Sequence, residues 1–383
     1  METRKLYYED CHLWRFTARV TGCTQTERGF EVTLDATAFY PEGGGQACDL
    51  GMLAQARVLD VQERGEQVVH LCDRALPVGD TVEGRIDAER RFDLMQQHSG
   101  EHIVSGIVHK RFGYHNVGFH VGKDVMEIDF DGDIRPGELA DIEAEANRAV
   151  WENLPVRCWY PSAEELPHVG YRTKRALPWP VRVVEIPGVD KCACCGVHTA
   201  ATGEIGLIKI LSCVKFHQGV RLELVCGGRA YRYLANVWEQ NRLVSQVFSA
   251  KPLETGAAAQ RMQEALAAEK FRAAGLEKRL LKAVAERYVN QERVLHFEPG
   301  LSGGAVRELA EKIAEGSGTA LVLSGEEGRY SFCIISRRED ASSLGRAMLQ
   351  ALDGRGGGKK QAFQGTVMAA AEQIRAFWDG AGC

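Results

Sequence analysis

One short segment limits what this chain can fold around. Residues 191–198 read Lys-Cys-Ala-Cys-Cys-Gly-Val-His, which places three thiols and one imidazole within seven residues. The first ten residues carry charges and lack the apolar stretch of a signal peptide, so we expect a soluble, cytoplasmic protein. Cysteines in a reducing compartment are metal ligands or buried thiols more often than disulfides. The segment therefore predicts a metal site.

The segment alone leaves two arrangements of that metal open. Its three cysteines and His198 offer enough ligands for a self-contained zinc site. Against this arrangement, Cys192 and Cys194 are only two residues apart, and so short a loop rarely closes a tetrahedron alone. The alternative is that one thiol and His198 join ligands from a distant part of the chain.

A predicted helix carries candidates for those distant ligands. Apolar residues recur with helical spacing after Asp87, and Gly113 is a plausible end of the helix. His98 and His102 are four residues apart, so both rings project from one face and can reach one metal. Taken alone, the pair is weak evidence, because two histidines on a helix are more often surface or hydrogen-bonded core residues than metal ligands. Glu101 does not follow the first histidine, which excludes the zincin pattern.

A run of glycines interrupts the β-rich N-terminal region. Alternation of apolar and polar residues predicts a small barrel or sandwich, with strands at residues 16–20, 29–34 and 67–71. Gly43, Gly44 and Gly45 cannot form a strand interior, and they allow positive φ angles or the close approach of a ligand. A surface turn is the alternative, which the flanking aromatic residues and Gln46 make less favourable.

The second half of the chain changes character twice. Residues 203–211 and 220–225 are expected to be strands of a hairpin. Between 236 and 296, Leu266, Ala273 and Leu280 recur every seven residues, which favours a long helical hairpin or short coiled coil. From about residue 297 the pattern is that of a separate α/β unit, with a helix at 306–316 and strands at 319–323 and 330–335.

A glycine-rich basic segment lies in the last unit. Residues 354–361 read Gly-Arg-Gly-Gly-Gly-Lys-Lys-Gln, which we interpret as a loop that offers backbone N–H groups beside Arg355, Lys359 and Lys360. Such a loop can hold phosphate oxygens, although its spacing excludes a Walker NTPase and a flexible loop tip remains the alternative. Because the formal net charge of the chain is -5, a polyanion must bind a local patch.

Together these patterns predict an α+β protein with four parts. We expect a small β-barrel that carries the glycine motif, an α/β core that contains zinc, a helical linker or coiled coil, and a C-terminal α/β domain, at residues 1–90, 91–235, 236–296 and 297–383. No apolar run approaches the roughly 18 residues that a membrane helix needs, so no membrane association is expected.

Three motifs resemble a known family. In chain order, Phe39-Tyr-Pro-Glu-Gly-Gly-Gly-Gln46, His98-x3-His102 and Cys194-x3-His198 resemble the editing domain of alanyl-tRNA synthetase, and most closely its free-standing relatives, the AlaX-type alanyl-tRNA editing proteins. Each motif alone is weak, whereas the three together are highly specific. The synthetase loop usually reads Cys-Gly-Gly-Thr-His and its helix motif His-Thr-Ala-Thr-His, so this chain differs within both motifs.

The resemblance extends over nearly the whole chain. Residues 6–10 are similar to the start of the editing proteins, and the last block resembles the DHH-associated C-terminal domain of the longer members. That domain is expected to bind tRNA through Arg355, Lys359 and Lys360, or to form a homodimer, for which the helical arm is the other candidate. Because no aminoacylation domain precedes residue 1, the resemblance implies editing in trans.

The activity that the resemblance implies is ester hydrolysis. The expected partner and substrate is tRNA(Ala) mischarged with serine, with glycine as a further candidate, and the reaction needs zinc but no ATP. The resemblance assigns His98, His102 and Cys194 as zinc ligands, because a catalytic zinc keeps one position open. His198 is then either a fourth ligand or a base beside the metal.

The glycine turn is expected to meet the amino acid. Thr37 and Gln46 bracket the turn and are the candidates for a hydrogen bond to the serine hydroxyl, while Gly43, Gly44 and Gly45 let the backbone approach the substrate. Two other functions stay open. One is a threonyl-tRNA-type editing hydrolase, and the other is a non-catalytic RNA-binding protein with a purely structural zinc.

Overall fold

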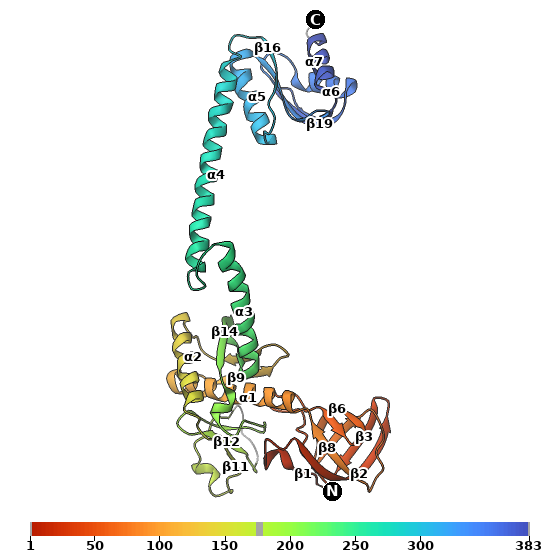
Figure 1. Cartoon of the computed structure of the whole chain (residues 1–383), viewed down its shortest axis with the longest axis vertical. Helices are drawn as coiled ribbons and strands as arrows, with labels where there is room; N and C mark the ends of the chain where they lie inside the picture. Colours follow the sequence, from red (N-terminus) through yellow and green to blue (C-terminus); the bar gives the residue numbers. More distant parts are fainter. Residues whose placement is uncertain (1, 174–178, 382–383) are drawn as a thin grey trace. The chain divides into compact units, whose positions relative to one another are not determined.

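The computed structural model describes residues 2–173 and 179–381. Helices and strands both contribute large shares of the chain, which confirms the mixed α+β class (Figure 1). The chain divides into two compact units, Met1–Leu243 and Val244–Cys383. Among the described residues, no helix has both the length and the apolarity to cross a membrane.

The first unit begins with a closed barrel of six strands. Their order around the barrel is β2-β3-β7-β6-β5-β8, with bounds Arg15–Thr26, Gly29–Leu34, Gln67–Cys72, Ala56–Arg64, Gly51–Leu53 and Thr81–Ile86. Along β8, exposed and buried residues alternate at every position. The inward side chains include Val20, Val32 and Val68, all fully buried. The alternation of apolar and polar residues that predicted these strands therefore also places the apolar side chains inside the barrel. A short parallel pair, β1 (Arg4–Lys5) with β4 (Ala36–Thr37), lies beside it.

Helix α1 (Ala88–Phe112) follows the barrel directly. The Asp87 side chain accepts a hydrogen bond from the Arg90 N–H and caps the first turn, and Gly113 ends the helix with a φ angle of 74°. Residues 94–108 are all buried. Because every face of this stretch is covered, α1 is a core helix, and polar side chains on it must find partners inside the protein.

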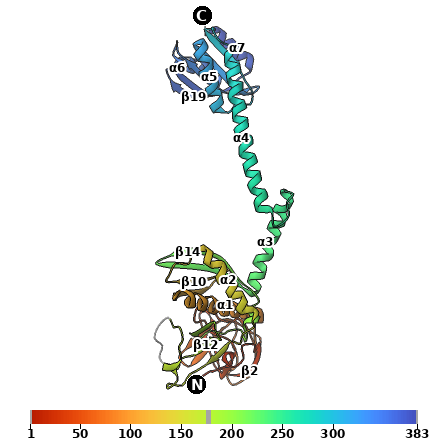
Figure 2. The same cartoon turned by 90° about the vertical axis from the view of Figure 1, so that its left-hand side faces the viewer.

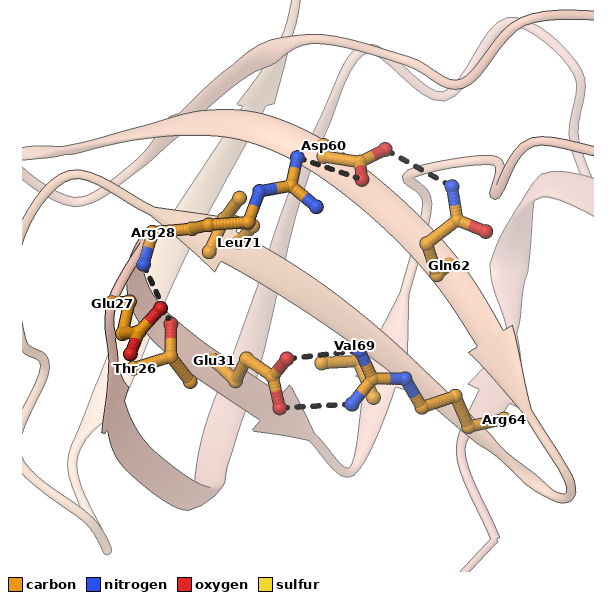
Figure 3. Close-up of a pocket in the computed structure, with 9 residues that line it drawn as sticks. All are labelled: Thr26, Glu27, Arg28, Glu31, Asp60, Gln62, Arg64, Val69 and Leu71. Atoms are coloured by element: carbon orange, nitrogen blue, oxygen red, sulfur yellow. Dashed lines mark hydrogen bonds and ion pairs between the residues drawn. The ribbon is translucent and has the colours of Figure 1, made fainter.

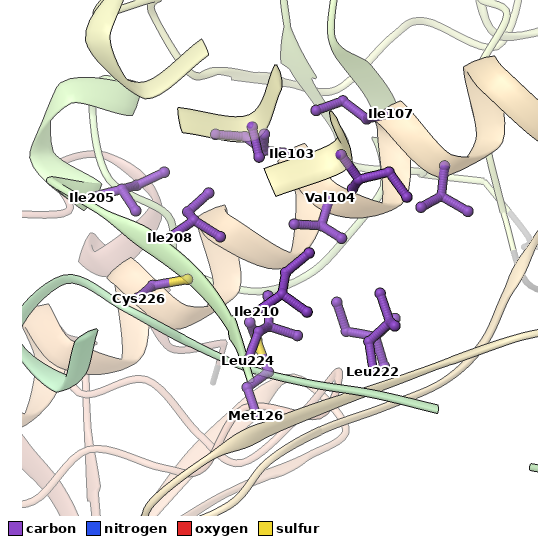
Figure 4. Close-up of a cluster of buried hydrophobic side chains, with 14 of the residues drawn as sticks. Ile103, Val104, Ile107, Met126, Ile205, Ile208, Ile210, Leu222, Leu224 and Cys226 are labelled. Atoms are coloured by element: carbon purple, nitrogen blue, oxygen red, sulfur yellow. The ribbon is translucent and has the colours of Figure 1, made fainter. Parts of the chain in front are cut away.

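A four-stranded sheet packs against α1. Its order is β14-β15-β10-β9, with bounds Ile208–Phe216, Gly219–Cys226, Met126–Phe130 and Asn116–Val121. Ile103 and Val104 of α1 and Leu224 of β15 lie in one buried cluster (Figure 4). Helix α2 (Pro136–Trp151) contributes buried residues such as Ile142 to the same cluster.

The expected strand at 203–211 is wrong at its start. Residues Thr202–Ile205 form the 3-10 helix η3, and the strand begins only at Ile208. Gly206 separates the two elements with a φ angle of 78°, a left-handed conformation that an extended strand does not contain. The alternating pattern across this segment reflects burial of Ile205 beside the strand rather than pairing within it.

A third, smaller sheet holds the cysteine segment. Its strands β11 (Arg157–Trp159), β12 (Val183–Ile186) and β13 (Asp190–Ala193) pair antiparallel in that order. β13 runs straight into residues 194–198, so the segment begins from a strand that the sheet fixes. Two further 3-10 helices, η1 (Leu6–Tyr8) and η2 (Leu166–His168), and most of helix α3 (Gly227–Val247) also belong to the first unit.

The second unit is a sheet with helices on both faces. Its strand order is β16-β17-β18-β20-β19, with bounds Arg293–Phe297, Thr319–Glu326, Arg329–Ser336, Ala362–Met368 and Asp353–Lys359. Helices α5 (Gly303–Ser317), α6 (Ala341–Ala351) and α7 (Ala371–Gly380) belong to this unit (Figure 2). Side chains of α5 contribute to one buried cluster, and side chains of α6 and α7 contribute to another. The region expected to be helical is occupied by α3 (Gly227–Val247) and α4 (Thr255–Glu286), and α4 continues through Gly275.

The glycine-rich basic segment is a strand, which corrects its interpretation as a loop. Residues Asp353–Lys359 form β19, an edge strand that pairs antiparallel with β20 along its whole length. Glycine is uncommon in strands, which is why the sequence suggested a loop. Here the two backbones approach so closely that a Cβ at Gly356 would lie 2.7 Å from the Gln364 carbonyl oxygen. Side chains at Gly354, Gly356 and Gly358 would therefore collide with the β20 backbone. A Cβ at Gly357, by contrast, would meet no atom of the described chain within 4 Å.

A fully buried ion pair joins the barrel to α1. The Arg91 guanidinium donates from Nε to both oxygens of Asp49, at 2.8 and 2.9 Å, and from Nη2 to the Ala38 carbonyl at 2.6 Å. Asp49 also accepts a hydrogen bond from the Tyr40 N–H at 2.6 Å. Both charged side chains have no exposed surface. The pair fixes α1 against the chain that leads out of the glycine turn.

Removal of Asp49 should destabilise the first unit strongly. Asp49→Ala leaves the Arg91 charge buried without its partner, which costs about 3–5 kcal/mol of unfolding free energy. Urea denaturation measures the loss. The exposed Arg4–Glu9 pair serves as control, because Arg4→Ala should not shift the midpoint. An Asp49→Ala protein as stable as the wild type would contradict this role.

Candidate metal and substrate site

Four of the predicted site residues lie together in the first unit. His98 and His102 come from α1, and Cys194 and His198 come from the segment after β13. Their ligand atoms all lie within 4.8 Å of one another. The Cys194 sulfur is 3.3 Å from His98 Nε2 and 3.6 Å from His198 Nε2. The three histidines are almost completely buried, and Cys194 is half-buried.

Hydrogen bonds from outside the cluster orient two of the rings. His98 Nδ1 is 2.8 Å from Gln46 Oε1, and His102 Nδ1 is 2.8 Å from Asp190 Oδ2. Oxygen atoms accept from both Nδ1–H groups, so the Nε2 lone pair of each ring faces the cluster. This is the usual arrangement behind metal-binding histidines. Gln46 and Asp190, which come from two other segments, thus orient the His98 and His102 rings of α1 so that both Nε2 atoms face the cluster.

Asp190 is itself held in position. Arg172 donates from Nε to Asp190 Oδ1 at 2.7 Å and from Nη2 to Oδ2 at 2.9 Å. Burial raises the pKa of Asp190, but its hydrogen bonds to His102 and Arg172 outweigh burial and hold the pKa below its usual value. The residue is therefore a carboxylate, and it presents a fixed charge to the His102 ring.

The protonation states of Cys194 and His198 suit a metal. Burial raises the pKa of the Cys194 thiol, but its electrostatic interactions with His98 and His198 and its hydrogen bonds with His102 and His198 outweigh burial and leave the pKa well below the usual value. Burial lowers the pKa of His198 to about 3, so its imidazole is neutral. Burial also lowers the pKa of His102, but its hydrogen bonds to Asp190 and Cys194 outweigh burial and raise the pKa well above the usual value, so metal binding at Nε2 releases a proton. A thiolate with imidazoles is a common zinc donor set, and the residues therefore fit that ion.

The glycine turn places Gln46 against His98. Gly43 and Gln46 exchange two backbone hydrogen bonds, at 3.1 and 3.0 Å. Between them, Gly44 and Gly45 have φ angles of 61° and 83°, as in a type I′ turn. A Cβ on Gly45 would also lie 2.9 Å from the Phe119 carbonyl oxygen. The turn therefore needs glycine both for its backbone and for its contact with β9.

The cysteine segment reaches the cluster because its backbone is clamped. Arg182 donates from Nη1 to the carbonyl oxygens of Cys194 and Gly196, at 3.0 and 2.9 Å. The Tyr8 hydroxyl donates to the Cys195 carbonyl at 2.6 Å, and the Arg182 guanidinium stacks over the Tyr8 ring. At Gly196 any Cβ would collide with the His98 ring. These contacts explain why the segment needs a glycine between the thiol and His198.

The other two cysteines of the segment lie elsewhere. Cys195 is exposed, and its sulfur belongs to no ligand group among residues 2–173 and 179–381. Cys192 lies near His102 and Asp190 instead of joining the group of four. The geometry therefore favours a site shared between helix and segment over one that the segment forms alone.

The remaining predicted residues lie apart from the cluster. Thr37 is fully buried, and its hydroxyl is 2.8 Å from His70 Nε2 of β7 and accepts a hydrogen bond from the Phe39 N–H. The second unit carries the three basic residues of the glycine-rich segment on and after β19, and all three are exposed. These three residues are Arg355, Lys359 and Lys360. None of them forms an ion pair with a residue that the structure describes.

Sequence reasoning missed the residues that support the cluster. Asp190 precedes Cys192 by two positions, so a carboxylate beside a metal motif was the available signal. Arg172 and Arg182 gave none, since they act through contacts between segments that only the fold brings together. The position of Glu101 beside His102 excludes the zincin pattern but does not indicate its contact with the cluster.

A pocket of about 360 Å³ on the outer face of the barrel is a weaker candidate site (Figure 3). Its charged side chains pair with each other: Arg64 donates twice to Glu31 at 2.9 Å, and Arg28 lies 4.0 Å from Asp60. No residue of the metal cluster lines it. With its cations already neutralised, it offers little to a phosphate or carboxylate.

Comparisons with known proteins place these features in context. Residues 3–90 match the family model described as tRNA synthetases class II (A), and residues 181–222 match the threonyl and alanyl tRNA synthetase second additional domain. The alanyl-tRNA editing protein Aarsd1 of Rattus norvegicus is 29% identical over 97% of this chain and 96% of its own length. The resemblance to the alanyl-tRNA editing proteins is confirmed.

Other editing proteins and some ligases are similar as well. The Aarsd1 editing protein of Danio rerio is 27% identical over 93% of this chain and 92% of its own length. The alanine–tRNA ligase of Thermofilum pendens is 34% identical over 95% of this chain. This chain spans 42% of that ligase, so the similarity concerns less than half of the larger enzyme.

The shared site predicts how metal content responds to mutation. We expect one zinc per chain in the wild type by elemental analysis. His98→Ala and Cys194→Ala should each lower the occupancy, because each removes a ligand. Cys192→Ala is the matched control and should retain the metal. Loss of zinc from Cys192→Ala together with retention in His98→Ala would show that the segment binds the metal alone.

Proposed function

We propose that this chain is a trans-editing hydrolase that deacylates Ser-tRNA(Ala), with Gly-tRNA(Ala) as a further substrate. The observation that carries the proposal is the group of two helix histidines, one thiolate and one further histidine within 4.8 Å, in a chain similar to alanyl-tRNA editing proteins over nearly its whole length. We propose zinc as the cofactor. The reaction consumes water and the aminoacyl ester, and it needs no ATP.

Hydrogen bonds from outside the cluster distinguish the roles that we assign to its four residues. When bound, zinc supplies a Lewis acid for the ester carbonyl and lowers the pKa of water. His98 and His102 are held by Gln46 and Asp190, so we assign them with Cys194 as permanent ligands. His198 Nδ1 is buried and has no hydrogen-bond partner in the described part of the chain. No described side chain outside the cluster orients its ring, and we propose His198 as a fourth ligand or as a base beside the metal.

Gln46 is the better candidate for recognition of the serine hydroxyl. Its Oε1 is occupied by the His98 Nδ1–H, while its Nε2 is buried without a partner among the described residues. An unpaired buried donor costs free energy that a substrate hydroxyl recovers, whereas alanine has no such group. The Thr37 hydroxyl is already bonded to His70. We therefore propose that Gln46, on the turn Gly43–Gln46, selects serine.

We propose that the second unit contains the main tRNA-binding surface. Arg355, Lys359 and Lys360 are exposed near one edge strand and form no ion pair with the described residues. Unpaired cations along a strand suit contacts with successive phosphates. We propose residues 297–383 as the tRNA-binding domain and residues 236–296 as the helical linker, and either part can also form a homodimer.

The central kinetic prediction concerns amino acid selectivity. The purified protein should hydrolyse Ser-tRNA(Ala) much faster than Ala-tRNA(Ala), followed by release of labelled amino acid. Gln46→Glu keeps an oxygen for His98 but removes the Nε2 donor, so kcat/KM for the serine ester should fall by about tenfold or more while zinc stays bound. Equal rates of the wild type on both esters, or none on either, would remove the editing assignment. Ser-tRNA(Thr) as substrate tests the threonyl alternative.

The basic edge predicts the salt dependence of tRNA binding. Replacement of Arg355, Lys359 and Lys360 by alanine should raise KM for tRNA and make the log–log salt plot shallower, by roughly 0.7–0.9 for each phosphate that is no longer bound. The kcat should stay unchanged, because the metal site lies in the first unit. An unaltered salt slope would instead point to assembly as the role of this domain.

A further inference from the structure

Two further buried polar residues lie on the same face of α1 as His98 and His102, and one of them is the carboxylic acid Glu101. His98, Glu101, His102 and Ser105 are spaced so that they lie on one face of the helix. Glu101 is only 5% exposed. Its Oε2 is 3.9 Å from His102 Nε2, the nitrogen that faces the cluster. A carboxylate oxygen therefore lies at the edge of the metal site.

The other carboxylate oxygen is fixed by two donors. Glu101 Oε1 accepts from Ser105 Oγ and from Asn116 Nδ2, both at 2.5 Å. Asn116 Nδ2 also lies 3.1 Å from Ser105 Oγ, so the three side chains hold each other. No hydrogen bond from the described residues reaches Oε2, and no lysine or arginine among them lies within ion-pair distance of it. The carboxylate is rigid and has one free oxygen.

This buried network lacks donors. Asn116 Oδ1 is also buried and has no partner within residues 2–173 and 179–381. Rotation of the amide by half a turn would place its oxygen against Glu101, so the present orientation is the favourable one. Buried carboxylates are stable only when they are paired and hydrogen-bonded. A bound cation that carries N–H donors is therefore a suitable partner for Glu101 Oε2.

Glu101 borders the metal cluster without belonging to it. Its oxygens are absent from the group of four whose ligand atoms lie within 4.8 Å of each other. In an aminoacyl ester, one carbon separates the α-ammonium from the carbonyl that reacts. A substrate with its carbonyl at the cluster therefore carries its ammonium group toward neighbouring atoms such as Glu101 Oε2.

We propose that Glu101 binds the α-ammonium group of the aminoacyl ester, an inference that rests on the proposed editing function. Ser105 and Asn116 are positioning residues that hold the carboxylate. The substrate class is then narrower than esters of tRNA in general, because N-acylated and peptidyl esters lack the cation. Gln46 selects the side chain, whereas Glu101 selects the free amino group.

Two non-hydrolysable probes test this role in the full-length, zinc-loaded protein. One is adenosine with L-serine in amide linkage at the 3′ position, and the other carries glyceric acid, in which a hydroxyl replaces the ammonium. Calorimetry should show that the wild type binds the seryl probe about ten- to a hundredfold more tightly. Equal affinities would overturn the proposal without the use of any variant.

Glu101→Gln keeps the shape of the side chain and removes its charge. It should reduce the ratio of the two affinities to within about twofold while one zinc per chain is retained. Glu89→Gln, an exposed residue on the same helix, should keep the wild-type ratio. A Glu101→Gln protein that loses zinc but keeps the ratio would show that Glu101 only offsets the charge of the metal. Wild-type protein that releases serine from Ser-tRNA(Ala) but binds both probes equally would overturn this inference and leave the editing function intact.

Discussion

The arrangement of the site depends on two hydrogen bonds that fix the imidazoles of α1. Gln46 holds His98 from the glycine turn, and Asp190 holds His102 from the start of β13. Because each bond uses Nδ1, each ring presents Nε2 to the same volume, where the Cys194 sulfur also lies. The barrel, the core helix and the small sheet therefore have to be placed correctly for one ligand set to form. The role of the fold is to bring these three elements together so that their side chains meet at one metal site.

Much of the fold could be predicted because local signals and tertiary structure agree. Asp87 and Gly113 mark the ends of α1 in the sequence, and both cap it in the structure. A prediction failed where pairing with a neighbouring strand outweighs the low strand preference of glycine. The glycines of residues 354–358 indicated a loop, yet a neighbouring strand pairs with them, and their lack of side chains permits the close backbone approach. A single sequence does not show which partner strand is near.

The site was accessible from the sequence only in part. The spacing of His98 and His102 and the density of cysteines pointed to a metal, and the resemblance suggested that Cys194 and His198 join the helix pair. Which thiol lies at the cluster follows from the clamp that Arg182 and Tyr8 form on the segment. The free oxygen of Glu101 depends on Ser105 and Asn116 and becomes evident only in three dimensions.

The central claim is that helix and segment share one zinc. X-ray absorption at the zinc edge of the loaded protein tests it directly, because sulfur and nitrogen ligands differ in distance, about 2.3 Å against about 2.0–2.1 Å. The shared site predicts one sulfur and two or three nitrogen ligands around the metal. Two or three sulfur ligands would show that the cysteine segment holds the metal by itself, and they would contradict a site shared with the helix.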